Sequence, residues 1–463
     1  MENILIDTDS YKASHWMQYP PGTKSMFSYI ESRGGQFDET VFFGLQYLLK
    51  KYLEGPVITV QDVLEAEAFY HAHGVPFNSK GWYYIANNLG GYLPVRIRAV
   101  PEGTVVPNSN ALVTIESTDE DTFWVASWLE TMLVRLWYPI TTATISYNTR
   151  KLISSYLERT SDKGPEEVLF KLHDFGSRGV SSQESAAIGG AAHLINFLGS
   201  DTIVGVRLAN KYYHSKMSGF SIPAAEHSTI TSWGKENEDK AYENMLKSYA
   251  KPGGLLAVVS DSYNIFNACE NIWGGSLREK VIQSGATLVI RPDSGDPESV
   301  VRNVLNILDN KFGSKVNSKG FKVLNYVRVI QGDGVNINSI GQILRGVEED
   351  GFSVENIAFG MGGALLQHHN RDTQKFAMKC SSITVDGKDV DVYKQPVTDS
   401  VKVSKKGRLD LIRVNGSHGF AYETVKLNSD EMYHSNTVMR IVFENGKILV
   451  EDTLDQIRYR AWG

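Results

Sequence analysis

The sequence has few cysteines, no excess of positive charge and no long hydrophobic run. Its two cysteines, Cys269 and Cys380, lie far apart and lack Cys-x-x-Cys spacing, which excludes a disulfide framework and a zinc knuckle. The 47 Lys and Arg residues against 53 Asp and Glu residues give a formal charge of −6. This balance argues against a protein that coats nucleic acid or an anionic membrane, because such a surface needs excess Lys and Arg.

No apolar run reaches the roughly 18 residues of a membrane-spanning helix. The N-terminus, MENILIDTDSYK, is acidic where a secretory signal would be basic. We therefore expect a cytoplasmic protein with reduced thiols. The 463 residues are 42% hydrophobic and 22% charged, which is ordinary globular usage and suggests two or three domains.

The pattern of the sequence changes near residues 145 and 375. Between these positions short apolar runs recur, each followed by a helical pattern: VLFKLHDFG, TIVGVRL, FSIPAAEHS, LLAVVSDSY, TLVIRPDSGDP, YVRVIQGDG and NIAFGMGG. Repeated strand-then-helix units predict a parallel sheet, most economically closed as an irregular (α/β) barrel. Both chain ends show β-like pieces instead and predict one discontinuous, β-rich α+β domain. The predicted parts are residues 1–145, 146–374 and 375–463.

Local signals mark several helix ends. Ser181 with Glu184 predicts a capping box, and Asp296 followed by Pro297 predicts an N-cap with proline at the first helical position. A tryptophan-rich stripe beginning near Trp124 predicts a core helix that ends at Pro139.

Catalytic groups of a parallel barrel come from the carboxyl ends of its strands. Arginines there bind phosphate oxygens, and aspartates bind Mg²⁺ or ribose hydroxyls. His227 could be oriented and made more nucleophilic by Asp261. The glycines of GMGG follow the last predicted strand, where barrel phosphate sites are common. The set suits a phosphorylated sugar that carries a diphosphate, and its members are His173, Asp174, Phe175, Arg178, Arg207, Glu226, His227, Asp261, Arg291, Asp293, Gly332, Asp333, Gly360, Gly362 and Gly363.

Several longer strings are family-specific: HDFGSRG, SIPAAEHST, SDSYNIFNAC, IRPDSGDP, IQGDGV, TDSYKASHWMQYPPGT and SKKGRLDL. Through them nearly the whole chain resembles the nicotinate/nicotinamide phosphoribosyltransferase family, in particular its nicotinamide-using members. The resemblance implies a homodimeric pentosyltransferase with the type II phosphoribosyltransferase fold. It would join nicotinamide to phosphoribosyl pyrophosphate and release nicotinamide mononucleotide and diphosphate in NAD salvage. Mg²⁺ would be the cofactor, and ATP a facultative co-substrate that phosphorylates a histidine.

The resemblance also implies roles for individual residues. His227, Asp261 and Asp293 would be catalytic, with His227 phosphorylated by ATP and oriented by Asp261. The metal ligands stay open, because Mg²⁺ could arrive with the diphosphate and be met by Asp261 or Asp293. The binding groups would be, for nicotinamide, Phe175, Asp201, Arg291 and the partner subunit's Tyr11; for diphosphate, Arg178, His227 and Arg291; for ribose and phosphate, Asp293, Gly332, Asp333, Gly362, Gly363 and the partner subunit's Arg371; and for a basic entrance, Arg33, Lys379 and Lys402.

Three other functions are alternatives to the synthesis of nicotinamide mononucleotide. Nicotinate is the nearest alternative substrate, but Asp201 would place a carboxylate beside its carboxylate, which is electrostatically costly. A non-catalytic or extracellular signalling role is disfavoured by the intact strand-end set, and an isomerase or aldolase by the lack of a strand-end lysine. Two departures from familiar members, Ser177 in place of a tyrosine and a short loop after Arg33, affect the mouth of the site.

Overall fold

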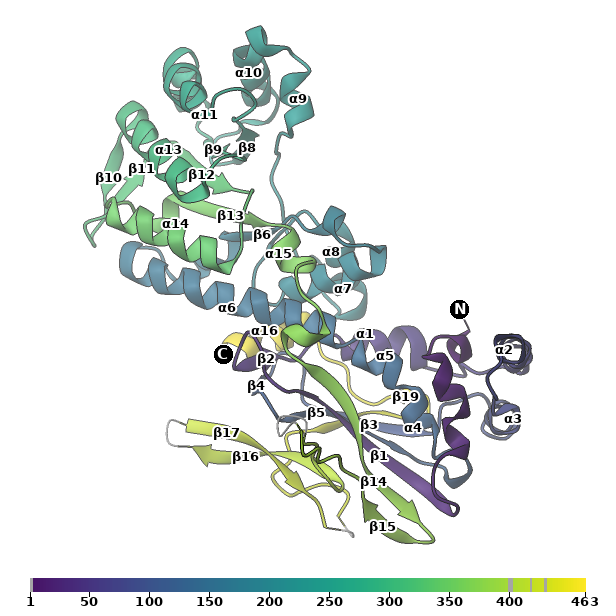
Figure 1. Cartoon of the computed structure of the whole chain (residues 1–463). Coiled ribbons are helices and arrows are strands. Elements are labelled where there is room, and N and C mark those ends of the chain that lie inside the picture. The colour runs from purple at the N-terminus through teal and green to yellow at the C-terminus, as the bar shows by residue number, and fades with distance from the viewer. Residues whose placement is uncertain (1–2, 399–402, 417–418, 429–430) are drawn as a thin grey trace. The chain divides into compact units, whose positions relative to one another are not determined.

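The computed structural model describes residues 3–398, 403–416, 419–428 and 431–463. The chain divides into two compact units (Figure 1). Unit 1 contains residues 1–144, 211–215 and 369–463, and unit 2 contains residues 145–210 and 216–368. Each unit has its own sheet, and each is described separately.

Unit 2 contains a six-stranded sheet in which every pairing is parallel. Its strands in spatial order are β7 (Gly199–Ser200), β6 (Leu172–Asp174), β13 (Ile357–Met361), β12 (Val327–Gln331), β9 (Thr287–Arg291) and β8 (Leu255–Val259). Because all run the same way, their carboxyl ends meet at one edge.

A further segment joins the two edge strands of this sheet. Phe220 makes a parallel bridge to Gly199 of β7, and Ala224 makes one to Ala257 of β8. The curled sheet thereby becomes an irregular α/β barrel, which confirms the predicted fold class. Its interior contains Ala257, Val289 and Ile330, against which Phe175 and Ile222 pack.

Helices alternate with these strands (Figure 1). The seven longest are α6 (Trp137–Thr160, which spans the boundary between the units), α7 (Gln183–His193), α8 (Ile203–Tyr212), α10 (Glu238–Tyr249), α12 (Arg278–Ser284), α13 (Pro297–Phe312) and α14 (Ile337–Glu349). Short helices are α9 (His227–Thr231), α11 (Ile265–Asn267) and α15 (Gly363–Leu366), and a small hairpin pairs β10 (Ser314–Val316) with β11 (Lys322–Leu324). Asp296 caps α13, with Pro297 at its start, as predicted.

Three local predictions were wrong. TIVGVRL begins helix α8 instead of a strand, because Gly205 must pack closely against Gly190 of α7 while Arg207 faces solvent in mid-helix. The cap of α7 is Ser182, not Ser181. Pro139 does not end a helix but lies in the first turn of α6, where a missing N–H costs little.

Unit 1 is built from both chain ends, as predicted. Its seven-stranded sheet is antiparallel throughout. In order the strands are β15 (Lys388–Asp391), β14 (Phe376–Val385), β1 (Thr23–Ser32), β5 (Ala111–Ser117), β3 (Val95–Ala99), β18 (Arg440–Glu444) and β19 (Lys447–Ile448). Figure 1 shows purple β1 lying beside green β14, so segments about 350 residues apart pair directly.

The rest of unit 1 consists of two small hairpins and several helices. One hairpin pairs β16 (Leu409–Gly416) with β17 (Gly419–Lys426), and the other pairs β2 (Glu39–Val41) with β4 (Val105–Pro107). The helices are α1 (Leu45–Leu48), α2 (Val60–His73), α3 (Ser79–Asn88), α4 (Val125–Trp128), α5 (Glu130–Val134) and α16 (Leu454–Trp462). Trp124 and Trp128 are buried, which confirms that the tryptophan-rich stripe belongs to the core.

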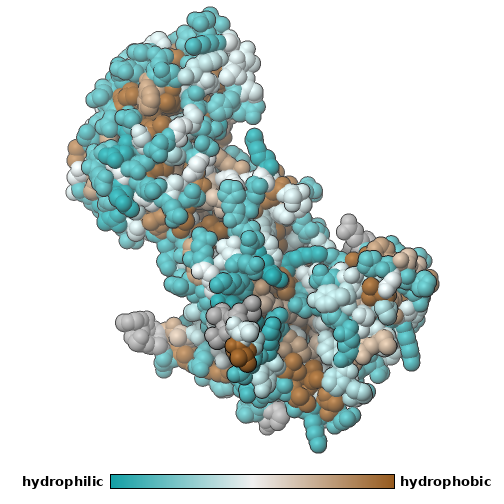
Figure 2. All heavy atoms as spheres, viewed as in Figure 1, coloured by the Kyte–Doolittle hydropathy of each residue, from teal (hydrophilic) through white to brown (hydrophobic). Residues whose placement is uncertain are grey.

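The surface in Figure 2 is mainly hydrophilic, and its hydrophobic residues form scattered groups. Within the described part of the chain, no helix combines the length and apolarity needed to cross a membrane.

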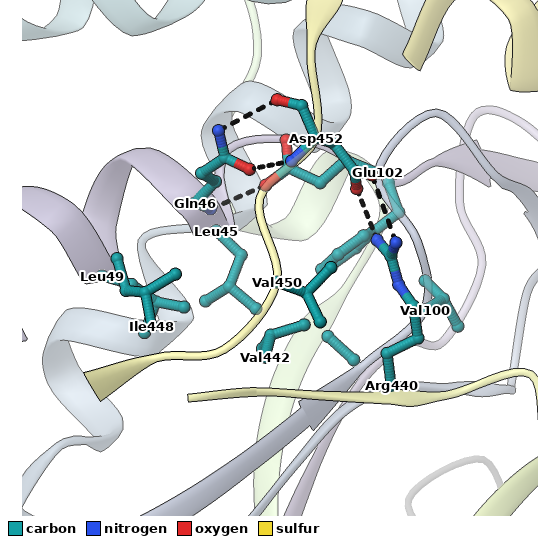
Figure 3. A pocket seen from close by; sticks show the side chains of 12 residues that line it. Leu45, Gln46, Leu49, Val100, Glu102, Arg440, Val442, Ile448, Val450 and Asp452 are labelled. Carbon is teal, nitrogen blue, oxygen red and sulfur yellow. Dashed lines mark hydrogen bonds and ion pairs between the residues drawn. The ribbon is translucent and has the colours of Figure 1, made fainter. Parts of the chain in front are cut away.

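A small pocket in unit 1 is lined by Gln46, Glu102 and Asp452 among others (Figure 3), and Gln46 also contacts segment 211–215 of this unit. The Gln46 side chain donates to the carbonyl of Tyr212 at 2.6 Å and to that of Asp452 at 3.0 Å. Glu102 accepts from the backbone N–H groups of Gly44 and Gln46 at 3.0 and 2.7 Å, which satisfies the start of α1. Burial raises the pKa of Glu102 to about 7.

Glu102 should make folding stability depend on pH. The pKa of the Glu102 carboxyl is 4.5 in the unfolded chain and about 7 in the folded protein. The contribution of Glu102 to the free energy of unfolding therefore falls by about 3 kcal/mol as pH rises between these values. We expect Glu102→Gln to be less stable than wild type at pH 5, because one backbone donor loses its acceptor, and this difference to shrink toward pH 7.5. Urea unfolding across this range measures it. The exposed Glu166→Gln is the control, and a pH-independent difference for Glu102→Gln would contradict the assignment.

Candidate functional site at the carboxyl ends of the strands

Phe175 follows β6 and occupies space that glycines leave open. A Cβ atom on Gly360 would lie 2.0 Å from Cε2 of Phe175, and one on Gly332 would lie 3.7 Å from the same atom. The Phe175 N–H donates to the Met361 carbonyl at 3.0 Å, which continues the pairing of β6 with β13. The glycines at the ends of β12 and β13 therefore set the position of this ring.

His227, Asp261 and Ser294 form a connected group. Nε2 of His227 lies 2.8 Å from Oδ1 of Asp261, and the Ser294 hydroxyl donates to Oδ2 of Asp261 at 2.6 Å. The Asp261 side chain is only 6% exposed, whereas that of His227 is 44% exposed. The His227 imidazole is therefore accessible to a ligand, and the buried Asp261 carboxylate contacts its Nε2.

Arg291 and Asp293 lie at the end of β9. Nε of Arg291 is 3.6 Å from Oδ1 of Asp293, and a Cβ atom on Gly332 would lie 2.9 Å from that oxygen. The pKa of Asp293 is raised, mainly by burial and further by Asp261 and Asp333, against the opposing effect of Arg291 and His227. Asp293 therefore lies within electrostatic range of two other carboxylates, and this environment favours a cationic or hydroxyl-bearing ligand.

Asp201 follows β7 on the other side of Phe175 in the strand order. Its carboxylate accepts a hydrogen bond from the Ser221 hydroxyl, and its backbone N–H donates to the Asp174 carbonyl at 3.0 Å. His173 lies within electrostatic range, and burial lowers its pKa while Asp201 opposes that shift. Asp201 is exposed, so its remaining acceptor positions can meet a ligand.

Two buried groups hold this edge of the barrel. Oδ1 of Asp174 accepts from the Gly176 N–H at 2.7 Å, which fixes the turn after Phe175, and burial raises the pKa of Asp174 to about 6. His193 lies 3.0 Å from the Ser146 hydroxyl and 3.2 Å from the Gly199 carbonyl. Burial lowers the pKa of His193 to about 3, so it is a neutral structural link between α6, α7 and β7.

The predicted phosphate-binding residues of unit 2 lie on loops beyond the strands. Arg178 is exposed on a short 3₁₀ turn after Phe175. Gly362 and Gly363 follow β13, and a Cβ atom on Gly363 would lie 2.9 Å from Nε2 of His368. Asp333 is exposed beside Gly332.

The remaining predicted site residues belong to unit 1. Tyr11 is 59% exposed. Lys379 on β14 is half-buried, and its pKa is lowered by burial and by Arg33, Lys394 and Arg371, against the opposing effect of Glu130. Arg33, Lys394 and Arg371 thus lie within electrostatic range of Lys379, and this group is called the basic cluster below; Nε of Arg33 is also 3.0 Å from Oε1 of Glu31. Lys402 lies outside the described residues.

The described residues contain no group of three or more His, Cys, Asp or Glu side chains arranged to hold a metal ion. Both oxygens of Asp261 already accept hydrogen bonds, and Asp293 faces Arg291. The ligands of any metal must therefore include atoms that the protein does not supply.

Sequence reasoning missed Ser294, Ser221 and His193 at this edge, and Lys394 in unit 1. Ser294 lies within the string IRPDSGDP and Ser221 within SIPAAEHST, but a serine in a loop carries no local signal of its partner. Their roles emerge only from contacts between distant segments.

Comparisons with known structures agree with this fold. Two crystal structures share the fold: nicotinate-nucleotide pyrophosphorylase from Pyrococcus furiosus (TM-score 0.63, 17% identity, covering 99% of this chain and 95% of that chain) and human nicotinic acid phosphoribosyltransferase (TM-score 0.60, 14% identity, covering 98% and 92%). The fold is that of the type II phosphoribosyltransferases.

The sequence comparisons identify the family. The model of the nicotinate phosphoribosyltransferase (NAPRTase) family matches residues 170–447, and that of the nicotinamide phosphoribosyltransferase N-terminal domain matches residues 3–97. Proteins named nicotinamide phosphoribosyltransferase from Xanthomonas campestris pv. campestris (strain 8004) and Acinetobacter baylyi (strain ATCC 33305 / BD413 / ADP1) are 56% and 31% identical. They match over 100% and 99% of this chain and 98% and 97% of their own lengths. The chain belongs to the nicotinate phosphoribosyltransferase family and is a pentosyltransferase.

The close approach of Gly360 to Phe175 can be tested by adding one methyl group. Gly360→Ala should destabilise the protein by about 1–3 kcal/mol, because the aromatic ring or the strand must move. The midpoint of urea unfolding measures this change. Gly164→Ala is the matched control, since a Cβ atom there would meet nothing within 4 Å. Equal stability of the two variants would show that Phe175 is not confined by Gly360.

Proposed function

We propose that this enzyme condenses nicotinamide with phosphoribosyl pyrophosphate, giving nicotinamide mononucleotide and diphosphate in NAD salvage. The observation that carries the proposal is the exposed carboxylate of Asp201 near Phe175, in a chain of this family. A carboxylate accepts hydrogen bonds from the carboxamide N–H₂ of nicotinamide, whereas it repels the carboxylate of nicotinate. The names of the two relatives support the same substrate.

The pyridine ring would stack on Phe175, whose position is set by Gly332 and Gly360. Arg291 and Arg178 would stabilise the charge that develops on the departing diphosphate. Asp293 and Asp333 would accept hydrogen bonds from the ribose hydroxyls, and Gly362 and Gly363 would leave room for the 5′-phosphate. The C1–O bond would break with oxocarbenium character as the ring nitrogen attacks the opposite face, so no protein nucleophile is needed. Holding the two reactants in place supplies roughly 7–11 kcal/mol of barrier reduction.

Mg²⁺ fits this site as a companion of the diphosphate. The raised pKa of Asp293 reflects burial and neighbouring carboxylates, which is an environment that a cation would relieve. Because Mg²⁺ binds through one or two carboxylates together with substrate phosphates, Asp293 or Asp261 would be the protein residue that holds it, with phosphate oxygens as its other ligands. When bound, it would supply charge neutralisation on the leaving group.

We further propose that ATP drives the reaction through phosphorylation of His227. The imidazole is exposed, and Asp261 faces its Nε2, which leaves Nδ1 as the nitrogen available to accept a phosphoryl group. A buried carboxylate beside the ring would stabilise the cationic form that appears after transfer. Hydrolysis of this phosphohistidine would favour net synthesis of the mononucleotide.

The proposal includes a homodimer in which each site receives the partner subunit's Tyr11 and Arg371. Tyr11 and Arg371 are exposed, and Arg371 belongs to the basic cluster that affects Lys379. An exposed aromatic ring such as Tyr11 can stack on the flat pyridine ring, and the basic cluster can bind the phosphate. A cytoplasmic location, supported by the low cysteine content, is part of the same proposal.

Product analysis tests the proposed reaction. The purified protein should form nicotinamide mononucleotide and diphosphate from nicotinamide, phosphoribosyl pyrophosphate and Mg²⁺, and ATP should increase the yield. Nicotinate in place of nicotinamide should give much less product. Chromatography of the nucleotide measures both reactions, and a protein that uses neither base would refute the proposal.

Asp201→Asn tests the basis of substrate choice. Removing the negative charge should favour nicotinate. The kcat/KM for nicotinamide divided by the kcat/KM for nicotinate should fall about tenfold or more, which corresponds to at least ~1.4 kcal/mol. Asp239→Asn makes the same chemical change at an exposed position on α10 and should leave the ratio unchanged. An unaltered preference in Asp201→Asn would rule out this role.

A further inference from the structure

The Ser294 hydroxyl makes a contact that none of the assigned roles uses. It donates to Oδ2 of Asp261 at 2.6 Å, while His227 occupies Oδ1 of the same carboxylate. Asp261 therefore has one partner on each oxygen. The two partners come from different strand ends, since His227 begins α9 and Ser294 follows β9.

Burial makes this second partner important. The Asp261 side chain is only 6% exposed although Ser294 itself is exposed, and without the serine hydroxyl this oxygen would lose the hydrogen-bond donor that the protein supplies. The carboxylate could then turn about its Cβ–Cγ bond and change the direction of its contact with His227. A hydroxyl on Oδ2 restricts that rotation.

The loop that carries Ser294 has a defined start and end. Pro292 is buried before it, and Gly295 after it adopts φ +85°, which side-chain-bearing residues rarely adopt. Asp296 then caps α13 by accepting from the Ser299 N–H at 2.9 Å. The serine therefore lies between a buried proline and the capped start of a helix.

The adjacent residue in this loop is Asp293, which faces Arg291 and is the proposed ribose ligand. We infer that Ser294 is a positioning residue for phosphorylation of His227, and that it ties the ATP-dependent histidine to the loop that binds the phosphoribosyl group. The inference rests on the proposed function. It adds to that function the contact through which phosphorylation of His227 and binding of the phosphoribosyl group depend on one loop.

The step it supports is a balanced phosphoryl transfer. Nδ1 of the neutral His227 imidazole attacks the γ-phosphorus of ATP, the bond from that phosphorus to the bridging oxygen breaks, and ADP leaves with the electron pair. The imidazole keeps its proton on Nε2 and becomes cationic. Asp261 faces that proton, and Ser294 keeps the carboxylate turned toward it.

The experiment compares three variants of the full-length protein. Ser294→Ala removes the hydroxyl, and Ser294→Thr retains it on a partly exposed loop. Ser262→Ala is the control, because the Ser262 hydroxyl adjoins Asp261 in sequence and has no hydrogen-bond partner among the described residues. Three quantities are measured: acid-labile ³²P transferred from γ-labelled ATP to the protein, nucleotide formation without ATP, and the melting temperature.

Ser294→Ala should lower the initial rate of phosphorylation about tenfold or more, as expected for loss of a hydrogen bond to a buried charge. Nucleotide formation without ATP should fall by a clearly smaller factor than the phosphorylation rate, and Ser294→Thr should recover most of the phosphorylation rate. Ser262→Ala should behave as wild type. Normal phosphorylation in Ser294→Ala, or parallel losses of phosphorylation, basal activity and melting temperature, would overturn the inference alone. A wild-type protein that makes the nucleotide but never carries phosphate would overturn it together with the proposed ATP coupling.

Discussion

The parallel pairing of β6 with β13 is the constraint on which the site depends. Its register sets Gly360 beside His173 and Met361 beside Asp174, so the chain leaves both strands at the same level and Phe175 lies over a glycine. A side chain at position 360 would collide with the ring. The same edge then receives Arg291 and Asp293 from β9 and Gly332 from β12. A shift of one residue in this pairing would turn the side chains of the shifted strand to the other face.

The site concentrates charge at some energetic cost. Asp261 and Asp333 lie within electrostatic range of Asp293, and the raised pKa of Asp293 reflects burial first and these charges second. Arg291 and His227 offset part of it. In a chain with a net charge of −6, arginines held at strand ends provide positive charge where a diphosphate needs it. Buried links such as Asp174 and His193 hold the backbone beneath these groups without entering the chemistry.

Much of this arrangement could be predicted from local patterns. Repeated strand-then-helix units indicated the parallel sheet, Asp296 with Pro297 marked the start of α13, and the β-like pieces at both ends indicated a shared domain. Where prediction failed, a tertiary contact outweighed local preference. Residues 202–208 have strand-like composition but form a helix, because Gly205 must pack against Gly190. Pro139 starts a long helix because its missing N–H falls in the first turn.

The sequence by itself determined the fold class, the family and the residue types at the strand ends, since these follow from periodicity and from motifs that are contiguous in the chain. Only the tertiary structure decided which side chains meet. The hydrogen bond from Ser294 to Asp261, the bond from Ser221 to Asp201, and the capture of segment 211–215 beside Glu102 each join residues that are distant in sequence. No local pattern specifies such pairs, because a hydroxyl or carboxylate acquires its partner only when the sheet has closed and brought the strand ends together.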